Sequence, residues 1–286
     1  MKTIRKFKMF DADEHIAVAV SGGKDSLSLL FILNKLFRKR RSFTLSSILI
    51  NEGIQGYRDQ TQKRAEQFCA LHHIPLHIYS FKDRFEHSLD EILALLKSHP
   101  CTECGILRRS LINRAAREIH VSKLATGHNL DDEAQAILMN QMRKNIALQA
   151  RLGPKTGSSS SEKFIPRIKP FYLIPEKEIA LYGYLNGLYT EFESCPYEQQ
   201  SFRAIVRDTL NTLEEKNPGI KNNIISSFLE ILPLLQKKYK GKVIPSCKEC
   251  GEPSASEQCS VCKLLEKIEI QEQIRKKEIT TPAFVE

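Results

Sequence analysis

The sequence predicts an α/β fold in which a parallel sheet is flanked by helices. Short apolar segments rich in β-branched residues alternate with longer amphipathic segments, a pattern typical of parallel sheets that are covered on both faces. The first apolar segment, His15–Val20, leads directly into a glycine-rich turn at 21–26, and parallel sheets bind ligands at such strand ends. A helical part and a small cysteine-rich module are expected after the sheet.

The predicted strands and helices follow from the period of the apolar residues. Runs that are short, apolar and β-branched are assigned to strands, and these are His15–Val20, 43–50, 75–81 and Lys123–Thr126. Segments with apolar residues on one helical face are assigned to helices, and these are 27–37, 57–72, 85–97, 101–119, Leu130–Met142, Phe202–Lys216 and Ile220–Tyr239.

The remaining segments are predicted from their turn and breaker residues. A stretch rich in Ser and Gly at 153–163 is expected to be a surface loop, and 166–172 is expected to be extended because Pro166 and Pro170 oppose a helix. Pro175 is expected to start a helix whose acidic first turn suits the helix dipole. A short lead-in helix and a charged C-terminal helix with a tail complete the prediction.

Composition limits the possible classes of protein. Hydrophobic residues make up 41% of the 286 residues, enough for a sizeable core, and no apolar run reaches the length of a membrane span. Without a recognisable targeting segment, the expected compartment is the cytoplasm. The net charge of +9 favours a polyanionic partner, although a basic surface that binds nothing would give the same number.

Cysteine usage points to metal or redox chemistry. There are eight cysteines, and in a cytosolic protein paired cysteines indicate metal or redox sites before disulfides. Six of them form three C-x-x-C pairs, at 101–104, 247–250 and 259–262. Cys69 has no such partner and is expected in the core.

The turn 21–26 (SGGKDS) has the composition of a phosphate site. Its two glycines let the backbone turn tightly and approach a ligand, and the N–H groups at the following helix start attract phosphate. Lys24 adds a positive charge, and the two serine hydroxyls can donate hydrogen bonds. An ordinary strand-to-helix turn is the alternative, which the apolar strand and the paired glycines disfavour.

The SGGKDS motif after an apolar strand resembles the PP-loop of the N-type ATP pyrophosphatases. Those enzymes cleave ATP to AMP and pyrophosphate while they adenylate a carbonyl oxygen. The resemblance implies an adenine nucleotide α-hydrolase-like domain with ATP and Mg²⁺ as cofactors, and Asp25 is expected to help hold the Mg²⁺. The nucleotide-binding residues that it implies in and before the loop are Ala19, Val20, Ser21, Gly22, Gly23, Lys24, Asp25 and Ser26.

Three further motifs narrow the resemblance. They are C-T-E-C-G-x-x-R-R at 101–109, T-G-H-N-L-D-D-E-A at 126–134 and E-S-C-P-Y at 193–197. With SGGKDS they make the chain resemble the PP-loop tRNA thiolation family of TtcA and TtuA type, and most nearly the archaeal and eukaryotic Ncs/Ctu-type tRNA 2-thiouridine synthetases. This resemblance covers most of the chain.

The resemblance implies an iron–sulfur cluster held by Cys101, Cys104 and Cys195. Three thiolates can hold three irons of a [4Fe-4S] cubane and leave the fourth iron without a protein ligand. An open metal position of this kind can polarise a sulfur nucleophile. Two alternatives are a persulfide and disulfide relay between Cys101 and Cys195 without a cluster, and a structural zinc at Cys101 and Cys104.

Other residues take roles from the same resemblance. Asp132 is expected to be a catalytic carboxylate near the base, although helix capping alone would explain an aspartate there. Gly127 is expected to let the backbone approach adenine or ribose, and Arg109 to contact an ATP phosphate. Arg108 stands where related enzymes can carry a lysine, and because a guanidinium does not readily lose its proton, Arg108 is expected to stabilise charge. The lone His128 is expected to be structural.

The C-terminal cysteines predict a zinc module. Cys247, Cys250, Cys259 and Cys262 supply four thiolates for a closed tetrahedral Zn²⁺ site, and disulfides are the alternative. A closed site has no open position for chemistry, so a role in stability or RNA docking is expected. The related proteins often carry a second zinc module before the PP-loop, for which no cysteines precede His15 in this chain.

Three regions are therefore predicted. Residues 1–172 are expected to form the PP-loop ATP-binding catalytic domain, and 173–240 a helical region that carries the third cluster cysteine. Residues 241–286 are expected to form the zinc module and tail.

The predicted function is ATP-dependent 2-thiolation of a tRNA uridine. ATP is expected to adenylate the C2 carbonyl oxygen, which is then replaced by sulfur delivered at the cluster. The sequence from 195 to 208 looks nearest to the enzymes for wobble uridine 34, and uridine 54 is the alternative. Basic residues expected to meet tRNA phosphates are Arg143, Lys144, Arg203 and Arg207.

Partners and rival functions follow from the same resemblance. The sulfur is expected from a thiocarboxylated ubiquitin-like protein or from free sulfide, and a homodimer is possible. A lysidine or amide synthetase with the same loop would need no cysteine triad. A non-catalytic, zinc-bearing RNA-binding protein would release no pyrophosphate.

Overall fold

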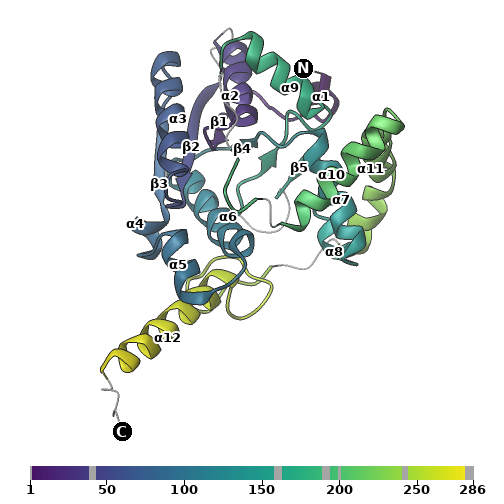
Figure 1. The fold of residues 1–286 in the computed structure, drawn as a ribbon. Helices are drawn as coiled ribbons and strands as arrows, with labels where there is room; N and C mark the ends of the chain where they lie inside the picture. Colours follow the sequence, from purple (N-terminus) through teal and green to yellow (C-terminus); the bar gives the residue numbers. More distant parts are fainter. Residues whose placement is uncertain are drawn as a thin grey trace.

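The computed structural model describes residues 2–38, 43–157, 163–188, 194–198, 201–239 and 244–280, the side chains of 278–280 excepted. It confirms the predicted α/β class, with a sheet of strand order β3-β2-β1-β4-β6-β5 between layers of helices (Figure 1). The strands are β1 (His15–Val20), β2 (Thr44–Asn51), β3 (Leu76–Ser80), β4 (Lys123–Thr126), β5 (Lys155–Thr156) and β6 (Arg167–Ile168).

All neighbouring strands in this order are parallel except β5, which runs antiparallel to β6. β1 is paired on both sides, with Val20 opposite Leu49 of β2 and Ala19 opposite Thr126 of β4. The carboxyl ends of β1 and β4 therefore lie side by side, and the loops that follow them meet at one edge of the sheet.

One face of the sheet is covered by helices whose apolar side chains meet β1. Ile16 and Val18 point to this face, while Ala17 points to the other, as the period of two in a strand requires. The helices on this face are α1 (Lys2–Lys6), α2 (Lys24–Phe37), α3 (Arg58–His72) and α9 (Glu176–Leu185).

The opposite face packs against a second set of helices and against the C-terminal cysteine module. Leu107 and Leu111 share one buried cluster with Ile48 of the sheet and with Leu264 and Ile268 near the C-terminus. The helices here are α4 (Phe81–Phe85), α5 (Leu89–Leu96), α6 (Pro100–Glu118) and α12 (Ser260–Thr280). The far end of α12 extends away from the body of the molecule (Figure 1).

A third buried cluster lies beyond β4. Tyr172, which is fully buried, packs there with Ile137, Leu210 and Phe228. The cluster is built from α7 (Leu130–Met142), α10 (Phe202–Lys216) and α11 (Ile220–Tyr239), with α8 (Ile146–Gln149) beside them.

The helix predicted at 85–97 was wrong at its start, and the strand predicted before it, 75–81, was one residue too long at each end. β3 ends at Ser80, whose hydroxyl accepts the Asp83 N–H and starts α4 at Phe81. Glu86, with φ of 64°, ends α4, and Ser88 with Glu91 forms a capping box that starts α5. The S-x-x-E spacing that marks this second start was legible in the sequence.

Two short strands were also not predicted as strands. β5 lies in the segment predicted as a loop and β6 in the segment predicted only as extended, because two-residue strands carry too little pattern to stand out. Residues 158–162 of that loop, Glu193 of the third cysteine motif and the tail from 281 lie outside the described residues. In the part of the chain that is described, no helix has the length and apolar character needed to span a membrane.

Candidate active site

The PP-loop turns sharply at Gly22 between β1 and α2. Gly22 has φ of +80°, and a Cβ there would lie 2.0 Å from the Thr61 carbonyl oxygen, so no other residue fits. Ser26 Oγ accepts the Ser21 N–H at 3.1 Å and donates to the Gly23 carbonyl at 3.0 Å. The loop is thus locked by its own hydroxyl and by the packing of α3.

The start of α2 presents the features of an anion site. Its N-cap, Gly23, makes no side-chain capping bond, so the first N–H groups of the helix lack the usual internal acceptor. Lys24 Nζ lies 2.8 Å from Asp25 Oδ2 and 2.5 Å from Glu176 Oε1 of α9. The other oxygen of Asp25, Oδ1, is buried without a hydrogen-bond partner, as expected of a carboxylate that has room for a cation.

The loop after β4 contacts the PP-loop directly. A Cβ on Gly127 would lie 3.1 Å from Asp25 C and from Ser26 N, so this glycine permits the close approach. Asp132 follows at the third position of α7, where Asn129 and Asp132 exchange hydrogen bonds in a capping box. Burial raises the pKa of Asp132 although Arg203, whose Nη1 lies 3.7 Å from Oδ1, acts in the opposite direction.

The two neighbouring aspartates at 131 and 132 have different environments. Asp131 is buried, forms an ion pair with Lys221 of α11 and accepts the Glu176 N–H at 2.7 Å. Asp131 therefore ties α7 to α11 and α9, whereas Asp132 lies at the same edge of the sheet as the PP-loop. The family resemblance had favoured Asp132, and the partners of Asp131 are visible only in the structure.

Asp25→Asn is expected to stabilise the metal-free and nucleotide-free protein at neutral pH. Burial raises the pKa of Asp25 to about 6, with Lys24 opposing the rise. Well below pH 4 the carboxyl is protonated in both the folded and the unfolded chain and costs nothing. Between about pH 4 and pH 6 the unfolded chain has lost this proton while the folded carboxyl still holds it, so stability falls, and above pH 6 the folded protein carries the desolvated charge at its full cost. The variant should therefore be more stable at pH 7.5 by about 1–3 kcal/mol.

Urea unfolding at pH 7.5 and at pH 4.5 measures this difference. The gain should shrink as the pH is lowered, because the native carboxyl is then protonated. A variant that is less stable at pH 7.5, or a gain that does not depend on pH, would contradict the expected cost of Asp25.

The three cysteines expected to hold a cluster lie in one region. Cys101 and Cys104 occupy the first turn of α6, and the Cys101 thiol donates to the Tyr197 carbonyl at 3.8 Å, two residues after Cys195. The N-cap of α6, His99, makes no side-chain capping bond, so this helix start also favours negative charge. Burial raises the pKa of Cys104 to about 11 and also raises that of Cys195, where Tyr197 acts in the opposite direction and the nearby Cys101 adds to the rise.

These three thiols do not lie close enough together to share a single ion. Among the described residues, the only group of acidic, histidine or cysteine ligands close enough to share one ion is formed by other cysteines. A cubane separates its cysteine sulfurs more widely than one tetrahedral zinc does. The raised pKa of Cys104 also means that a bound metal would have to displace a proton there.

The loop with Cys195 is attached to the body by its neighbours. The Tyr197 hydroxyl donates to Asp90 Oδ1 at 2.8 Å, and Asp90 Oδ2 accepts the Gln55 N–H at 2.8 Å. Glu198 forms an ion pair with Arg207 of α10. These contacts hold the third cysteine beside α6, and sequence reasoning did not identify Asp90.

A chain of polar contacts joins the PP-loop to the thiols. Arg58 donates to the Ser21 carbonyl at 3.0 Å and forms a buried ion pair with Glu52. The other oxygen of Glu52, Oε1, lies 3.6 Å from Arg108 Nη1. Arg108 in turn lies near Cys104: its charge acts to lower the pKa of the Cys104 thiol, and Cys104 acts to raise the pKa of Arg108. Glu52 follows β2 directly, so the rule that ligand sites lie at strand ends could have found it.

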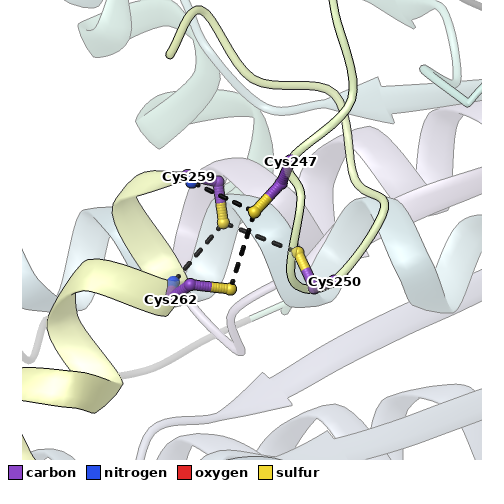
Figure 2. Close-up of side chains that lie close together, drawn as sticks. All are labelled: Cys247, Cys250, Cys259 and Cys262. Atoms are coloured by element: carbon purple, nitrogen blue, oxygen red, sulfur yellow. Dashed lines mark hydrogen bonds between the residues drawn. The ribbon is translucent and has the colours of Figure 1, made fainter. Parts of the chain in front are cut away.

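The C-terminal cysteines meet at a single point. Figure 2 shows their four sulfurs directed toward one another, and all lie within 4.8 Å. The Cys250–Cys259 and Cys247–Cys262 sulfur distances are 3.6 and 3.9 Å, close to the ~3.8 Å of tetrahedral Zn²⁺–thiolate bonding. N–H groups near the Cys247 sulfur, led by that of Cys250, lower its pKa to about 6. The donor set therefore fits Zn²⁺.

This cysteine module is anchored on the helix that carries Cys101 and Cys104. Arg117 of α6 contacts both carboxylate oxygens of Glu252, at 3.1 and 2.5 Å, and Arg114 lies 3.4 Å from Oε1. The buried Cys247 and Cys259 belong to the same core cluster as Leu107. The module thus supports the far half of α6.

Cys250→Ser is expected to lose zinc and to lower the free energy of unfolding by at least about 3 kcal/mol. Iron content per folded chain should fall much less, because Cys101, Cys104 and Cys195 belong to a separate site. Metal analysis and thermal unfolding measure both effects, with Ser260→Ala as a control beside the site. Loss of iron in step with zinc, in a variant that stays folded, would contradict this division of the cysteines.

The basic residues expected to meet tRNA have unequal surroundings. Arg203 donates to Gln135 Oε1 at 3.1 Å and Arg207 pairs with Glu198, so both already have partners within the chain. Arg143 lies over the Phe202 ring at 4.5 Å, and Lys144 follows it at the exposed end of α7.

Comparisons with known proteins agree with this site. A family model described as a PP-loop domain matches residues 1–214. The tRNA-5-methyluridine(54) 2-sulfurtransferase of Pyrococcus horikoshii is 36% identical over 262 residues, which cover 92% of this chain and 82% of that protein. The tRNA 2-thiolation protein NcsA of Haloferax volcanii is 34% identical over 262 residues, covering 88% and 82%.

A solved structure matches over almost the same length. It is the U34-tRNA thiolase NcsA from Methanococcus maripaludis with its [4Fe-4S] cluster. The two chains share 35% of their residues and superpose with a TM-score of 0.78, covering 93% of this chain and 85% of that one.

Proposed function

The chain belongs to the PP-loop family of tRNA 2-thiolation enzymes, and on that premise we propose that it thiolates C2 of uridine 34 in tRNA. In the proposed reaction ATP adenylates the C2 carbonyl oxygen and releases pyrophosphate, and sulfur then replaces that oxygen as AMP leaves. The observation that carries the proposal is the contact chain from Ser21 through Arg58 and Glu52 to Arg108, which puts a nucleotide loop beside three thiols.

The PP-loop residues are proposed to hold the triphosphate of ATP. The N–H groups at the start of α2 and the Lys24 ammonium would bind phosphate oxygens. Asp25, with one buried oxygen that has no partner, would hold Mg²⁺ against them. Ala19 and Val20 end the strand that leads into the loop, and Gly127 leaves room for adenine or ribose on the β4 side.

Asp132 and Arg108 are proposed to act on the base. Asp132, with its pKa raised by burial, would orient the uracil and exchange a proton as the C2 oxygen is activated. Arg108 is half exposed beside Cys104 and keeps its proton, so its role would be to stabilise negative charge that develops on the leaving group.

Cys101, Cys104 and Cys195 are proposed to hold a [4Fe-4S] cluster, which would supply an open iron position for the incoming sulfur. The nearby Arg108 and the positive end of the α6 dipole would offset the negative charge of three thiolates. Zinc at the other four cysteines would have a structural role. A thiocarboxylated protein or free sulfide as donor, a homodimer and a cytoplasmic location stay predictions.

Uridine 54 is the second candidate position, because the Pyrococcus relative carries that position in its name while the Methanococcus structure carries uridine 34. Anaerobically purified protein incubated with ATP, sulfide and tRNA tests the choice. Nuclease mapping with mass spectrometry is expected to find 2-thiouridine at position 34. Sulfur only at position 54 would replace the first assignment with the second, and pyrophosphate release without any thiolated base would overturn both.

A further inference from the structure

Arg109 of α6 and Arg167 of β6 are neighbouring arginines near the cysteines of α6. Arg109 folds back over the turn with Cys104, since a Cβ on Gly105 would lie 2.9 Å from its Nη1. Arg167, from β6, donates to the Arg109 carbonyl at 3.3 Å. Gly105 therefore leaves the space that the first guanidinium occupies, and the second is tied to the same helix.

This pair has no acidic partner among the residues that the structure describes. Other cations nearby do have one: Lys169 pairs with Glu133, Arg58 with Glu52, and Arg203 lies near Asp132. Although Arg109 has an exposed surface, surrounding protein lowers its pKa, and the adjacent Arg108 lowers it further. Burial also lowers the pKa of Arg167, and the positive charges of Arg109 and Arg108 lower it further.

Positive charges held this close repel one another, and a bound anion would neutralise them. Guanidinium groups match the oxygens of a phosphate, which they can bind in a bidentate manner, and the contact with the Arg109 carbonyl uses only one nitrogen of Arg167. Phosphate could reach them from two sources, the triphosphate of ATP or the backbone of the RNA substrate. The sheet order separates the two.

The PP-loop follows β1, whereas Arg167 lies on β6, with β4 between them. Two strand spacings of about 4.8 Å each place β6 roughly 10 Å from β1. The charged groups that affect Arg109 are Arg108 and Cys104, and those that affect Arg167 are Arg109 and Arg108, whereas those that affect Asp25 are Lys24, Glu176 and Asp132. The pair thus belongs to the thiol side of the site.

We propose that Arg109 and Arg167 bind a backbone phosphate of tRNA next to the nucleotide being modified. This inference rests on the proposed function for the identity of the RNA. A phosphate held on α6 and β6 would fix the backbone on one side of the base, and the base itself would then reach toward Asp132 and the cysteines. Arg109, expected from the family resemblance to contact ATP, would instead serve the RNA.

The test compares the double variant Arg109→Gln/Arg167→Gln with Arg109→Lys/Arg167→Lys, and with Arg84→Ala. Arg84 lies on α4, which follows β3, and pairs with Glu118. Its loss controls for the removal of a positive charge away from the proposed site. Filter binding of tRNA is measured between 50 and 400 mM KCl, and the KM for ATP is measured by pyrophosphate release at saturating tRNA.

The glutamine pair is expected to weaken tRNA binding about 10- to 100-fold and to reduce the slope of log K against log salt by about 0.7 to 0.9, the value for one lost phosphate contact. The KM for ATP should change less than about twofold. The lysine pair keeps both charges and should keep the slope.

Two results would overturn the inference. One is an unchanged salt slope in the glutamine pair. The other is a raised KM for ATP with unchanged tRNA affinity, which would assign the pair to the triphosphate. Wild-type protein that binds tRNA through these arginines but thiolates no uridine would instead defeat the proposed function and leave the phosphate site standing.

Discussion

Cys195→Ala is expected to remove bound iron and to reduce thiolation by about 10³-fold or more. Cys195 comes from a segment nearly a hundred residues after Cys101 and Cys104, and it is held near them by the contacts of Tyr197 with Cys101 and Asp90. With two thiolates left on α6, three irons cannot all keep a protein ligand. Zinc content and the affinity for ATP should remain, because both sites are built from other residues.

Iron, acid-labile sulfide and 2-thiouridine are measured on anaerobically purified protein. Cys69→Ala is the matched control: its thiol is buried, lies 3.4 Å from Ser47 Oγ and should leave the iron unchanged. If the wild-type protein held no iron but carried cyanide-labile sulfur that Cys195→Ala lost, the persulfide relay would replace the cluster. Full iron with full thiolation would remove Cys195 from the site.

Asp132→Asn and Asp131→Asn are expected to fail in opposite ways. Asparagine at 132 can still accept the Asn129 N–H of the capping box, so stability should change by less than about 1 kcal/mol. The amide cannot exchange a proton with the base, and kcat/KM for thiolation should fall about 10²–10³-fold. Asparagine at 131 breaks the buried ion pair with Lys221 and should cost about 3–5 kcal/mol of stability.

Pyrophosphate release with tRNA present, and urea unfolding, measure the two effects on the same preparations. The expected pattern is a stable but inactive Asp132→Asn and a destabilised Asp131→Asn that retains activity at low temperature. Full activity of Asp132→Asn would reduce that residue to a helix cap. A stable but inactive Asp131→Asn would exchange the roles of the two carboxylates.

Local signals explain what could be predicted. The strand at His15–Val20 and the helix Leu130–Met142 were predicted with their observed bounds, because the period of apolar residues is a property of adjacent residues. The turn predicted at 21–26 was too long, since α2 already begins at Lys24. The C-x-x-C pairs likewise place two sulfurs within one turn. The capping box at Ser88 is an equally local signal. The prediction overlooked it and therefore began the helix at 85, whereas α5 begins at Leu89.

The sequence by itself determined the α/β class, the phosphate loop and the presence of two kinds of cysteine site, since each is written within a few consecutive residues. The family resemblance grouped Cys195 with Cys101 and Cys104 and favoured Asp132. Tertiary structure alone decided which contacts hold Cys195 beside α6, that Asp131 pairs with Lys221, and that Arg167 meets Arg109. These pairs are separated by many residues along the chain, and only the strand order and the packing of helices on the sheet bring them into contact. The period of apolar residues within one segment reveals neither the order of the strands nor the packing of the helices.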